Sequence, residues 1–430
     1  MTAFETVRRL DVHRVFATGE RRPVGELAQN RQGVYFQYDA DYLRLCPSLS
    51  PFTLPFDGSL QRAPTEPHDG LHGVFADSLP DGWGRLLMDR VCRRHGVLPS
   101  ELTPMDRLSY VGNRGMGALQ FSPLSPFTPE SATDVDLIEL GERARTLFED
   151  DGAEVAPELA ATGSSGGARP KAVVYLTPAG GDSRMSTQPG AGLEPWLVKF
   201  TSASLPLGHE ESLCEAAYLK LAREAGIDTP EWRLIPTSGR AGSSAIASLA
   251  LKRFDCTPVG GRLHMLSLCG LLDADFRAPS IDYEDLIKAS QALCESAAVG
   301  QSQLVRAAFN LFALNQDDHT RNWAFLQDDD GRWRPSPCYD VTFSPSPYGE
   351  HTTAFAGHGA TPPLTAMQQL AAQANYASWG RAREMIEEVV DVIQRWPAVA
   401  AGLDVRPETR RLVGRRLDEV RVANRALLGR

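Results

Sequence analysis

The sequence predicts an α+β fold in which a small mixed α/β N-terminal domain precedes two lobes, one rich in strands and one helical. Residues 161–260 alternate short apolar runs with turns, as strands do, and residues 261–430 carry apolar residues mainly at helical spacing. A glycine-rich loop at 163–171 leads into the first strand of the β-rich half. This order of elements is typical of a two-lobed, protein-kinase-like fold with a β-rich nucleotide lobe and a helical C-terminal lobe.

The composition is that of a soluble globular protein with more than one domain. The chain has 430 residues, 42% of them hydrophobic and 23% charged, and this length predicts two or three domains. It contains no run of about 18 apolar residues, the length needed to cross a bilayer. Its first residues include basic side chains but no apolar secretion signal, so we expect a cytoplasmic protein without a membrane partner.

The formal net charge of −10 argues against a protein that binds nucleic acid on its own, because phosphate contacts require a concentrated basic surface. The C-terminal stretch at 406–430 is the basic exception. Its apolar residues recur at helical spacing between arginines, which favours a terminal amphipathic helix with a solvated basic face. Contact with a DNA-bound partner is the alternative. The seven cysteines include no C-x-x-C pair, so neither a disulfide framework nor a zinc site is expected.

The N-terminal domain, residues 1–125, is expected to consist of short strands separated by Pro and Gly turns. The clearest strands are at 33–45 and 116–123, and a helix is expected at 82–97. A patch rich in Pro, Ser and Thr then marks a boundary, and residues 126–160 are expected to be a linker with an acidic amphipathic helix.

The β-rich nucleotide-binding lobe is expected at 161–260 and the helical catalytic lobe at 261–430. Within the second lobe, one polar turn and an alternating, hairpin-like segment interrupt the helices at 316–340. In the first lobe the pattern predicts strands at 171–176, 194–201, 231–235 and 245–254, with a helix at 209–227.

Asp317 and Asn322 give the first indication of chemistry. Protein kinases place a catalytic aspartate five residues before an asparagine that binds Mg²⁺, and this pair has the same separation, whereas Asp318 is one residue too close. The chain after Asn322 alternates as a strand, turns at 328–331 and returns to Asp340, so a hairpin would bring a second carboxylate beside the amide. A capped turn with solvated aspartates is the alternative, but it does not explain Asp340.

Three further features suit phosphate and adenine binding. Two adjacent glycines in the loop 163–171 let backbone N–H groups approach phosphate oxygens, although a flexible linker would also be rich in glycine. Lys199 stands in an apolar strand, where an ammonium group is costly unless it meets an anion, and Glu215 in the next helix is placed to pair with it. A lysine that snorkels to solvent and a surface glutamate are the alternatives. Residues 250–255 end the β-rich half, where a hinge would offer backbone groups to adenine and Phe254 a flat contact. A core strand is the alternative for this segment.

Together these segments resemble the HipA family of bacterial serine/threonine kinases, which are toxins of toxin–antitoxin systems. FADSLPDGWGR at 75–85 and YVGNRGMGALQF resemble the N-terminal domain of the family, and GGARPK, VKF, KRFD, DDHTRN and PCYDVTFS resemble its kinase domain in the same order. The likeness covers nearly the whole chain. The D-x-H-x-x-N loop of the family falls on Asp317, His319 and Asn322, which selects Asp317 over Asp318.

The resemblance implies a role for each matched residue. Asp317 would be the catalytic base, with Asn322 and Asp340 as magnesium ligands. Lys199 would anchor phosphate and be held in place by Glu215. The other residues implied to bind ATP are Gly166, Gly167, Ala168, Arg169, Pro170, Lys171, Lys252, Arg253, Phe254, His319, Arg321 and Tyr339.

The resemblance also implies self-inactivation. Family members can phosphorylate a serine in the glycine-loop region, and the added negative charge would repel ATP. The matched residue is Ser164, with Ser165 as the neighbouring alternative. Two residues depart from the better-known pattern of the family: Lys252 stands in place of an acidic residue, and Pro170 is a proline that the usual loop lacks.

The implied function is an ATP- and Mg²⁺-dependent protein kinase that inhibits growth by phosphorylating a translation-related protein such as an aminoacyl-tRNA synthetase. The implied partner is a small helix-turn-helix antitoxin, through which this acidic chain would reach operator DNA. The alternative is a catalytically weak regulatory module that binds the antitoxin and DNA, but such a scaffold gains nothing from clustered, costly polar groups. Phosphotransfer to a small molecule is a third reading, and the N-terminal domain disfavours it.

Overall fold

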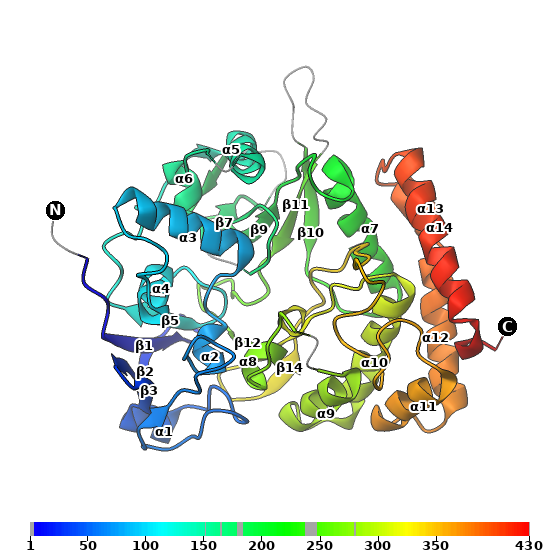
Figure 1. Ribbon diagram of the computed structural model, residues 1–430, viewed down its shortest axis with the longest axis horizontal. Coiled ribbons are helices and arrows are strands. Elements are labelled where there is room, and N and C mark those ends of the chain that lie inside the picture. The colour runs from blue at the N-terminus through cyan, green and yellow to red at the C-terminus, as the bar shows by residue number, and fades with distance from the viewer. Residues whose placement is uncertain are drawn as a thin grey trace.

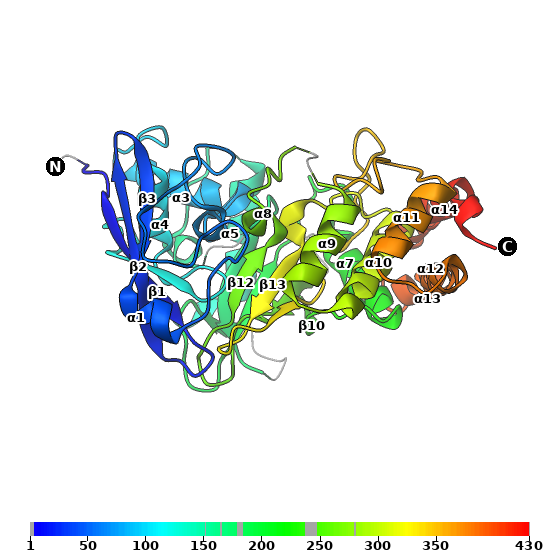
Figure 2. The same cartoon turned by 90° about the horizontal axis from the view of Figure 1, so that it is seen from below.

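The computed structural model describes residues 4–150, 152–163, 166–178, 184–236, 247–278 and 281–429. Within these residues the strands form three β-sheets, and helices pack around them. The first sheet lies at one end of the molecule and the helices nearest the C-terminus lie at the other, with the third sheet between them in both views (Figure 1 and Figure 2). The predicted mixture of helices and strands is confirmed.

The first sheet is antiparallel, in the order β4-β3-β2-β1-β5. The predicted strand at 116–123 is present as β5. The strand predicted at 33–45 is confirmed only in its first half, because β3 ends at Tyr38 and a helix follows. Asp39 then accepts hydrogen bonds from the first backbone N–H groups of helix α1 (Ala40–Leu45), which a helix start would otherwise leave unpaired. The strands are β1 (Arg9–Val15), β2 (Arg21–Asn30), β3 (Gly33–Tyr38), β4 (Gln61–Arg62) and β5 (Leu119–Ser122).

Helix α3 (Gly82–Arg94), predicted at 82–97, joins the N-terminal part of the chain to the second sheet. Its buried residues, which include Trp83 and Leu87, form one apolar core with strands of the second sheet and with helix α5. The acidic helix predicted within 126–160 is α5. The remaining elements up to residue 160 are α2 (Gly73–Ala76), α4 (Pro104–Val111), β6 (Val135–Asp136), α5 (Leu137–Glu149) and α6 (Pro157–Ala160).

The second sheet is antiparallel in the order β10-β11-β9-β7-β8-β6, and helix α7 (Glu211–Glu224) packs against β10 and β11 (Figure 1). In its register Lys171 lies opposite Lys199, so two ammonium groups from adjacent strands stand on one face of the sheet. After β6 its strands are β7 (Lys171–Leu176), β8 (Arg184–Ser186), β9 (Glu194–Lys199), β10 (Trp232–Pro236) and β11 (Ala247–Lys252).

The third sheet carries the predicted hairpin of residues 316–340. Its strands β12 (His264–Ser267), β13 (Ala324–Gln327) and β14 (Trp333–Pro335) pair antiparallel in that order. The helices that follow the second sheet are α8 (Leu268–Leu271), α9 (Tyr283–Leu293), α10 (Ala297–Phe312), α11 (Leu364–Gln373), α12 (Trp379–Ile393), α13 (Trp396–Ala401) and α14 (Pro407–Ala423).

The terminal helix α14 is amphipathic, as predicted. It buries Val413 and Leu417, while Arg411, Arg415 and Arg416 are exposed. Among the described residues, none of the helices combines the length and the apolar character that crossing a membrane requires.

Candidate active site

A cavity of about 470 Å³ lies between residues of all three sheets. Pro170 is outside its lining, and its carbonyl accepts a 2.9 Å hydrogen bond from the backbone N–H of Phe200. Ser164, the predicted phosphorylation site, lies outside the described residues. The other predicted site residues all line the cavity: Gly166, Gly167, Ala168, Arg169, Lys171, Lys199, Glu215, Lys252, Arg253, Phe254, Asp317, His319, Arg321, Asn322, Tyr339 and Asp340.

Hydrogen bonds within the turn that carries Asp317 fix its shape. The side-chain Nδ2 of Asn322 donates to the backbone carbonyl of Asp317 over 2.7 Å, and the backbone N–H of Asn322 donates to the carbonyl of His319 over 2.9 Å. The Asn322 amide therefore points its donor into the turn and offers Oδ1 as a ligand for a cation. The Asp317 side chain is 66% exposed, with Nε2 of His319 at 3.6 Å from its Oδ1, so its carboxylate can be reached by an incoming hydroxyl group.

The next residue, Asp318, has the opposite environment. Its side chain is fully buried and accepts hydrogen bonds from the hydroxyl of Tyr283 at 2.5 Å and from Nδ1 of His351 at 2.8 Å. The backbone N–H groups of Thr352 and Thr353 donate to it at 2.9 and 3.1 Å. Its carboxylate is saturated by these partners and holds the following loop in place.

Lys199 lies between two carboxylates. Its Nζ is 2.5 Å from Oε1 of Glu215, which is the predicted ion pair, and it also contacts Oδ1 of Asp340. Burial alone would lower the pKa of Lys199, but Asp340 and Glu215 together raise it above its ordinary value. Burial likewise opposes ionisation of Asp340, yet Lys199 and Lys171 hold the pKa of that carboxyl below its usual range. Both shifts favour the charged form of the group concerned.

The glycine loop is supported by cationic side chains. Nζ of Lys171 donates a 2.7 Å hydrogen bond to the carbonyl of Gly166, and Gly167 has φ +96°, a left-handed conformation that suits glycine. Burial lowers the pKa of Lys171. Arg169 reaches helix α7, where it forms a 2.8 Å ion pair with Glu211. The loop thus brings its backbone beside two basic side chains, those of Lys171 and Arg169.

The predicted hinge provides a flat apolar surface. The rings of Phe254 and Tyr339 stack with centroids 5.7 Å apart. The guanidinium of Arg253, however, is buried in a 2.5 Å ion pair with Asp255, and the backbone N–H groups of Lys252 and Arg253 donate to other backbone carbonyls. An adenine contact at this hinge would therefore use carbonyl groups or the Phe254 backbone.

Several lining residues were not identified from the sequence. One of them is Phe276, on one side of the cavity. Its ring centroid lies 4.5 Å from the guanidinium carbon of Arg321 and 5.8 Å from the ring centroid of His319. On another side the lining comes from the N-terminal part of the chain. The sequence signal for a site here is the pair of aspartates Asp77 and Asp81 in a segment that contains Pro and Gly. This signal is weak, because the partners of both aspartates lie far away in sequence. These N-terminal lining residues are Asp77, Ser78, Leu79, Asp81, Gly82, Met116, Ala118 and Leu119.

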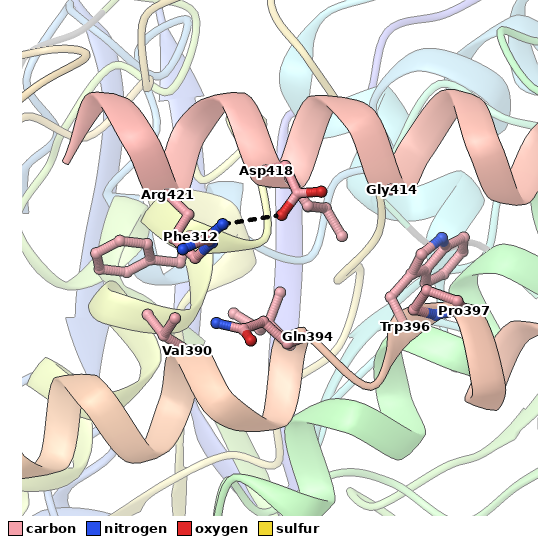
Figure 3. Close-up of a pocket in the computed structure, with 10 residues that line it drawn as sticks. Phe312, Val390, Gln394, Trp396, Pro397, Gly414, Asp418 and Arg421 are labelled. Carbon is pink, nitrogen blue, oxygen red and sulfur yellow. Dashed lines mark hydrogen bonds and ion pairs between the residues drawn. The ribbon is translucent and has the colours of Figure 1, made fainter. Parts of the chain in front are cut away.

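A second, smaller cavity of about 160 Å³ lies among helices α10, α12, α13 and α14 (Figure 3). It is lined mainly by apolar side chains such as Phe312, Val390 and Leu417, with one exposed 3.4 Å ion pair between Arg421 and Asp418. No predicted site residue lines it, so the candidate chemistry is concentrated in the larger cavity.

Comparison with protein families gave two matches along the chain. The family described as HipA-like C-terminal domain matches residues 163–396, which is more than half of the chain. The family described as HipA N-terminal domain matches residues 14–122. No curated protein sequence matched the chain.

Comparison with solved structures gave a likeness over nearly the full length of the chain. A chain from the complex of Shewanella oneidensis MR-1 toxin–antitoxin proteins HipA and HipB with operator DNA matches with a TM-score of 0.70 and 18% identity, covering 96% of both chains. At this identity the match shows a shared fold. The Helicobacter pylori proinflammatory kinase CtkA matches with a TM-score of 0.36 and 11% identity, over 54% of this chain and 89% of its own, and is too weak to argue from.

Proposed function

Because this chain belongs to the HipA family, we propose that it is an ATP- and Mg²⁺-dependent serine/threonine protein kinase that acts as the toxin of a toxin–antitoxin pair. One observation carries the proposal: a single cavity contains an exposed aspartate, a fixed asparagine and a buried lysine between two carboxylates. The two lobes of the kinase would be the second sheet with α7 on one side, and the third sheet with α9 to α14 on the other. Nucleotide would bind in the cavity between them.

The donor set fits a magnesium ion that is shared with nucleotide. Among the described residues, no group of three or more His, Cys, Asp or Glu side chains could hold a metal, so a site built from protein alone is not expected. Asn322 and Asp340 supply oxygen atoms to the same cavity, and Mg²⁺ sites in phosphotransferases combine one or two such ligands with phosphate oxygens. A bound ion of this kind neutralises negative charge on the phosphates.

The side chains of the cavity support a direct transfer of the terminal phosphoryl group. Asp317 would accept the proton of the acceptor hydroxyl while the acceptor oxygen bonds to the γ-phosphorus, and ADP would leave with the bridging oxygen. Lys199 and Lys171 would hold the phosphates of ATP, and the stacked rings of Phe254 and Tyr339 would contact adenine.

Partners and substrate extend the proposal beyond the site. The solved relative is in a complex with the antitoxin HipB and operator DNA. We propose that this chain also binds a small helix-turn-helix antitoxin, and reaches DNA through it because its own net charge is −10. Its substrate would be a cytoplasmic protein of translation, such as an aminoacyl-tRNA synthetase, and Ser164 would be its site of self-inactivation.

The decisive experiment supplies purified protein and a bacterial lysate with ATP labelled at the γ-phosphate and with Mg²⁺. Label is expected on the protein itself or on a lysate protein, and removal of Mg²⁺ with a chelator should abolish it. Phosphoproteomics after induced expression would then identify the substrate. Lack of incorporation, together with the absence of binding heat for ATP and Mg²⁺ in calorimetry, would refute the kinase and favour a regulatory module without catalysis.

A further inference from the structure

Residues 77–83, here called the strap, follow α2, include the first two residues of α3 and run along the cavity. They belong to the FADSLPDGWGR segment, to which the proposed catalytic mechanism assigns no role. Five of these residues line the cavity beside the predicted ATP-binding residues. The strap contacts both sides of the cavity.

On the side of the third sheet, the strap is anchored through its first aspartate. The carboxylate of Asp77 accepts a 2.5 Å hydrogen bond from the backbone N–H of Ser267 and a 2.6 Å bond from the hydroxyl of the same residue. The guanidinium of Arg321, two residues after His319, approaches the carbonyl of Leu79 in the strap at 3.5 Å and the carbonyl of Ala76, the last residue of α2, at 3.4 Å. These contacts attach the strap to the catalytic turn.

On the side of the second sheet, the strap is anchored to the glycine loop. The backbone N–H of Trp83 donates to the carbonyl of Gly167 over 3.0 Å, and its indole Nε1 donates to the carbonyl of Lys171 over 2.9 Å. Gly82 has φ +37°, and a Cβ added there would lie 2.6 Å from Cα of Ala168. Only a glycine allows the two backbones to approach this closely.

Asp81 joins the two sides. Its Oδ1 accepts a hydrogen bond from the backbone N–H of Gly167, and its Oδ2 accepts one from Arg321 at 2.9 Å. Both side chains of this ion pair are mostly buried, with 12% and 14% exposed. Asp81 occupies the N-cap position of α3, but its side chain makes no capping bond to that helix. An aspartate at an N-cap normally binds its own helix, so here its carboxylate is used across the cavity instead.

We propose that Asp81 is a positioning residue for phosphoryl transfer, which holds the glycine loop and Arg321 in place so that the N-terminal domain completes the nucleotide site. The inference rests on the kinase function proposed above. A loop with two adjacent glycines loses much conformational freedom when it is ordered. With Asp81 present, the loop is already ordered in the folded protein before ATP binds, so ATP binding does not have to order it. Without it, nucleotide would have to order the loop and Arg321 on binding.

The first test measures how strongly the contact from Asp81, here called the tether, orders the glycine loop, and it requires no enzymatic activity. Hydrogen exchange of backbone amides at 166–169 would be compared in the wild type, Asp81→Asn and Asp89→Asn, all without nucleotide. Asp89 is a matched control, because it forms a 2.6 Å ion pair with Arg107 inside the N-terminal domain. Exchange should accelerate about tenfold or more in Asp81→Asn alone. Unchanged exchange in that variant would overturn the tether whatever the protein catalyses.

The second test measures the steady-state kinetics of phosphotransfer as a function of ATP concentration. The KM for ATP should rise about tenfold in Asp81→Asn while kcat changes little, because the loss lies in the order of the loop before binding. Gly82→Ala should reproduce this effect by pushing the loop away, and Asp89→Asn should behave as the wild type. Thermal melting would check that each variant is folded.

The outcomes separate the inference from the kinase function. Tighter ATP binding by Asp81→Asn would show that the carboxylate competes with phosphate and would overturn the positioning role, as would equal KM values. A wild type that binds no ATP, while its exchange still depends on Asp81, would refute the kinase function and leave only a structural tether.

Discussion

Asp317 and Asp318 are neighbours in the chain but lie in opposite environments: the side chain of Asp317 is 66% exposed at the cavity, and that of Asp318 is fully buried. The first has room for a substrate hydroxyl, and the second is already saturated with protein donors. One turn thus supplies two aspartates whose removal is expected to have different effects.

Asp317→Asn is expected to abolish phosphotransfer, with a loss of about 10²-fold or more, because the amide cannot accept the proton of the acceptor hydroxyl. The melting temperature should change little, since the side chain is exposed. Incorporation of label from ATP and thermal melting would measure the two effects. Labelling equal to that of the wild type would contradict the role of Asp317 as base.

Asp318→Asn is expected to lower the free energy of unfolding by about 3 kcal/mol, because an amide group cannot accept all the hydrogen bonds that the buried carboxylate receives. Denaturant unfolding would measure the change. A midpoint equal to that of the wild type would show that the buried network contributes no stability.

Lys199→Met is expected to weaken ATP binding about tenfold or more, because it removes the ammonium and leaves the carboxylates of Glu215 and Asp340 without their shared partner. Calorimetry with ATP and Mg²⁺ would give the affinity. Lys288→Met is the control, since Lys288 forms only an exposed 2.5 Å pair with Glu284. If both variants bind ATP as tightly as the wild type does, Lys199 is not a phosphate anchor.

Asp340→Ala is expected to remove toxicity and to raise the Mg²⁺ concentration needed for any remaining activity, because one of two protein oxygen ligands is lost. Growth curves after induced expression and a Mg²⁺ titration of labelling would report both effects. Equal growth inhibition by the variant and the wild type would mean that toxicity does not depend on phosphotransfer.

Ser164→Ala is expected to prolong activity, because a phosphate beside the glycine loop would repel the phosphates of ATP. A time course of substrate labelling would show whether the variant remains active after the wild type has stopped. Mass spectrometry would locate the modified residue, and phosphate found only on Ser165 would move the assignment there.

The parts of the site that sequence could reveal are those encoded within one continuous segment or in adjacent elements. The hairpin that returns the chain from Asn322 to Asp340 was visible as two alternating runs around a turn, and both residues line one cavity. The pair of Lys199 and Glu215 was visible because a strand and the next helix carried them. Local pattern and known kinase spacing were sufficient in both cases.

Contacts between distant segments were not visible. Asp81 is 86 residues from Gly167 and 240 residues from Arg321, so no periodicity or spacing connects them. The burial of the Arg253 side chain against Asp255 was also missed, because a charged residue next to a predicted hinge reads as a ligand contact. At Asp39 two local signals conflict: the aspartate favours the start of a helix, whereas the alternating residues before it favour continuation of the strand.

The apolar core shared by α3 and the second sheet limits how such chains can diverge. Trp83 and Leu87 pack among side chains of β7 and β9, so the two halves of this core have to change together. Recombination that exchanged the N-terminal segment for that of a distant relative would bring together surfaces selected in different contexts, and misfit in a packed interior is costly. Inheritance of the two regions as a single unit is the expected result.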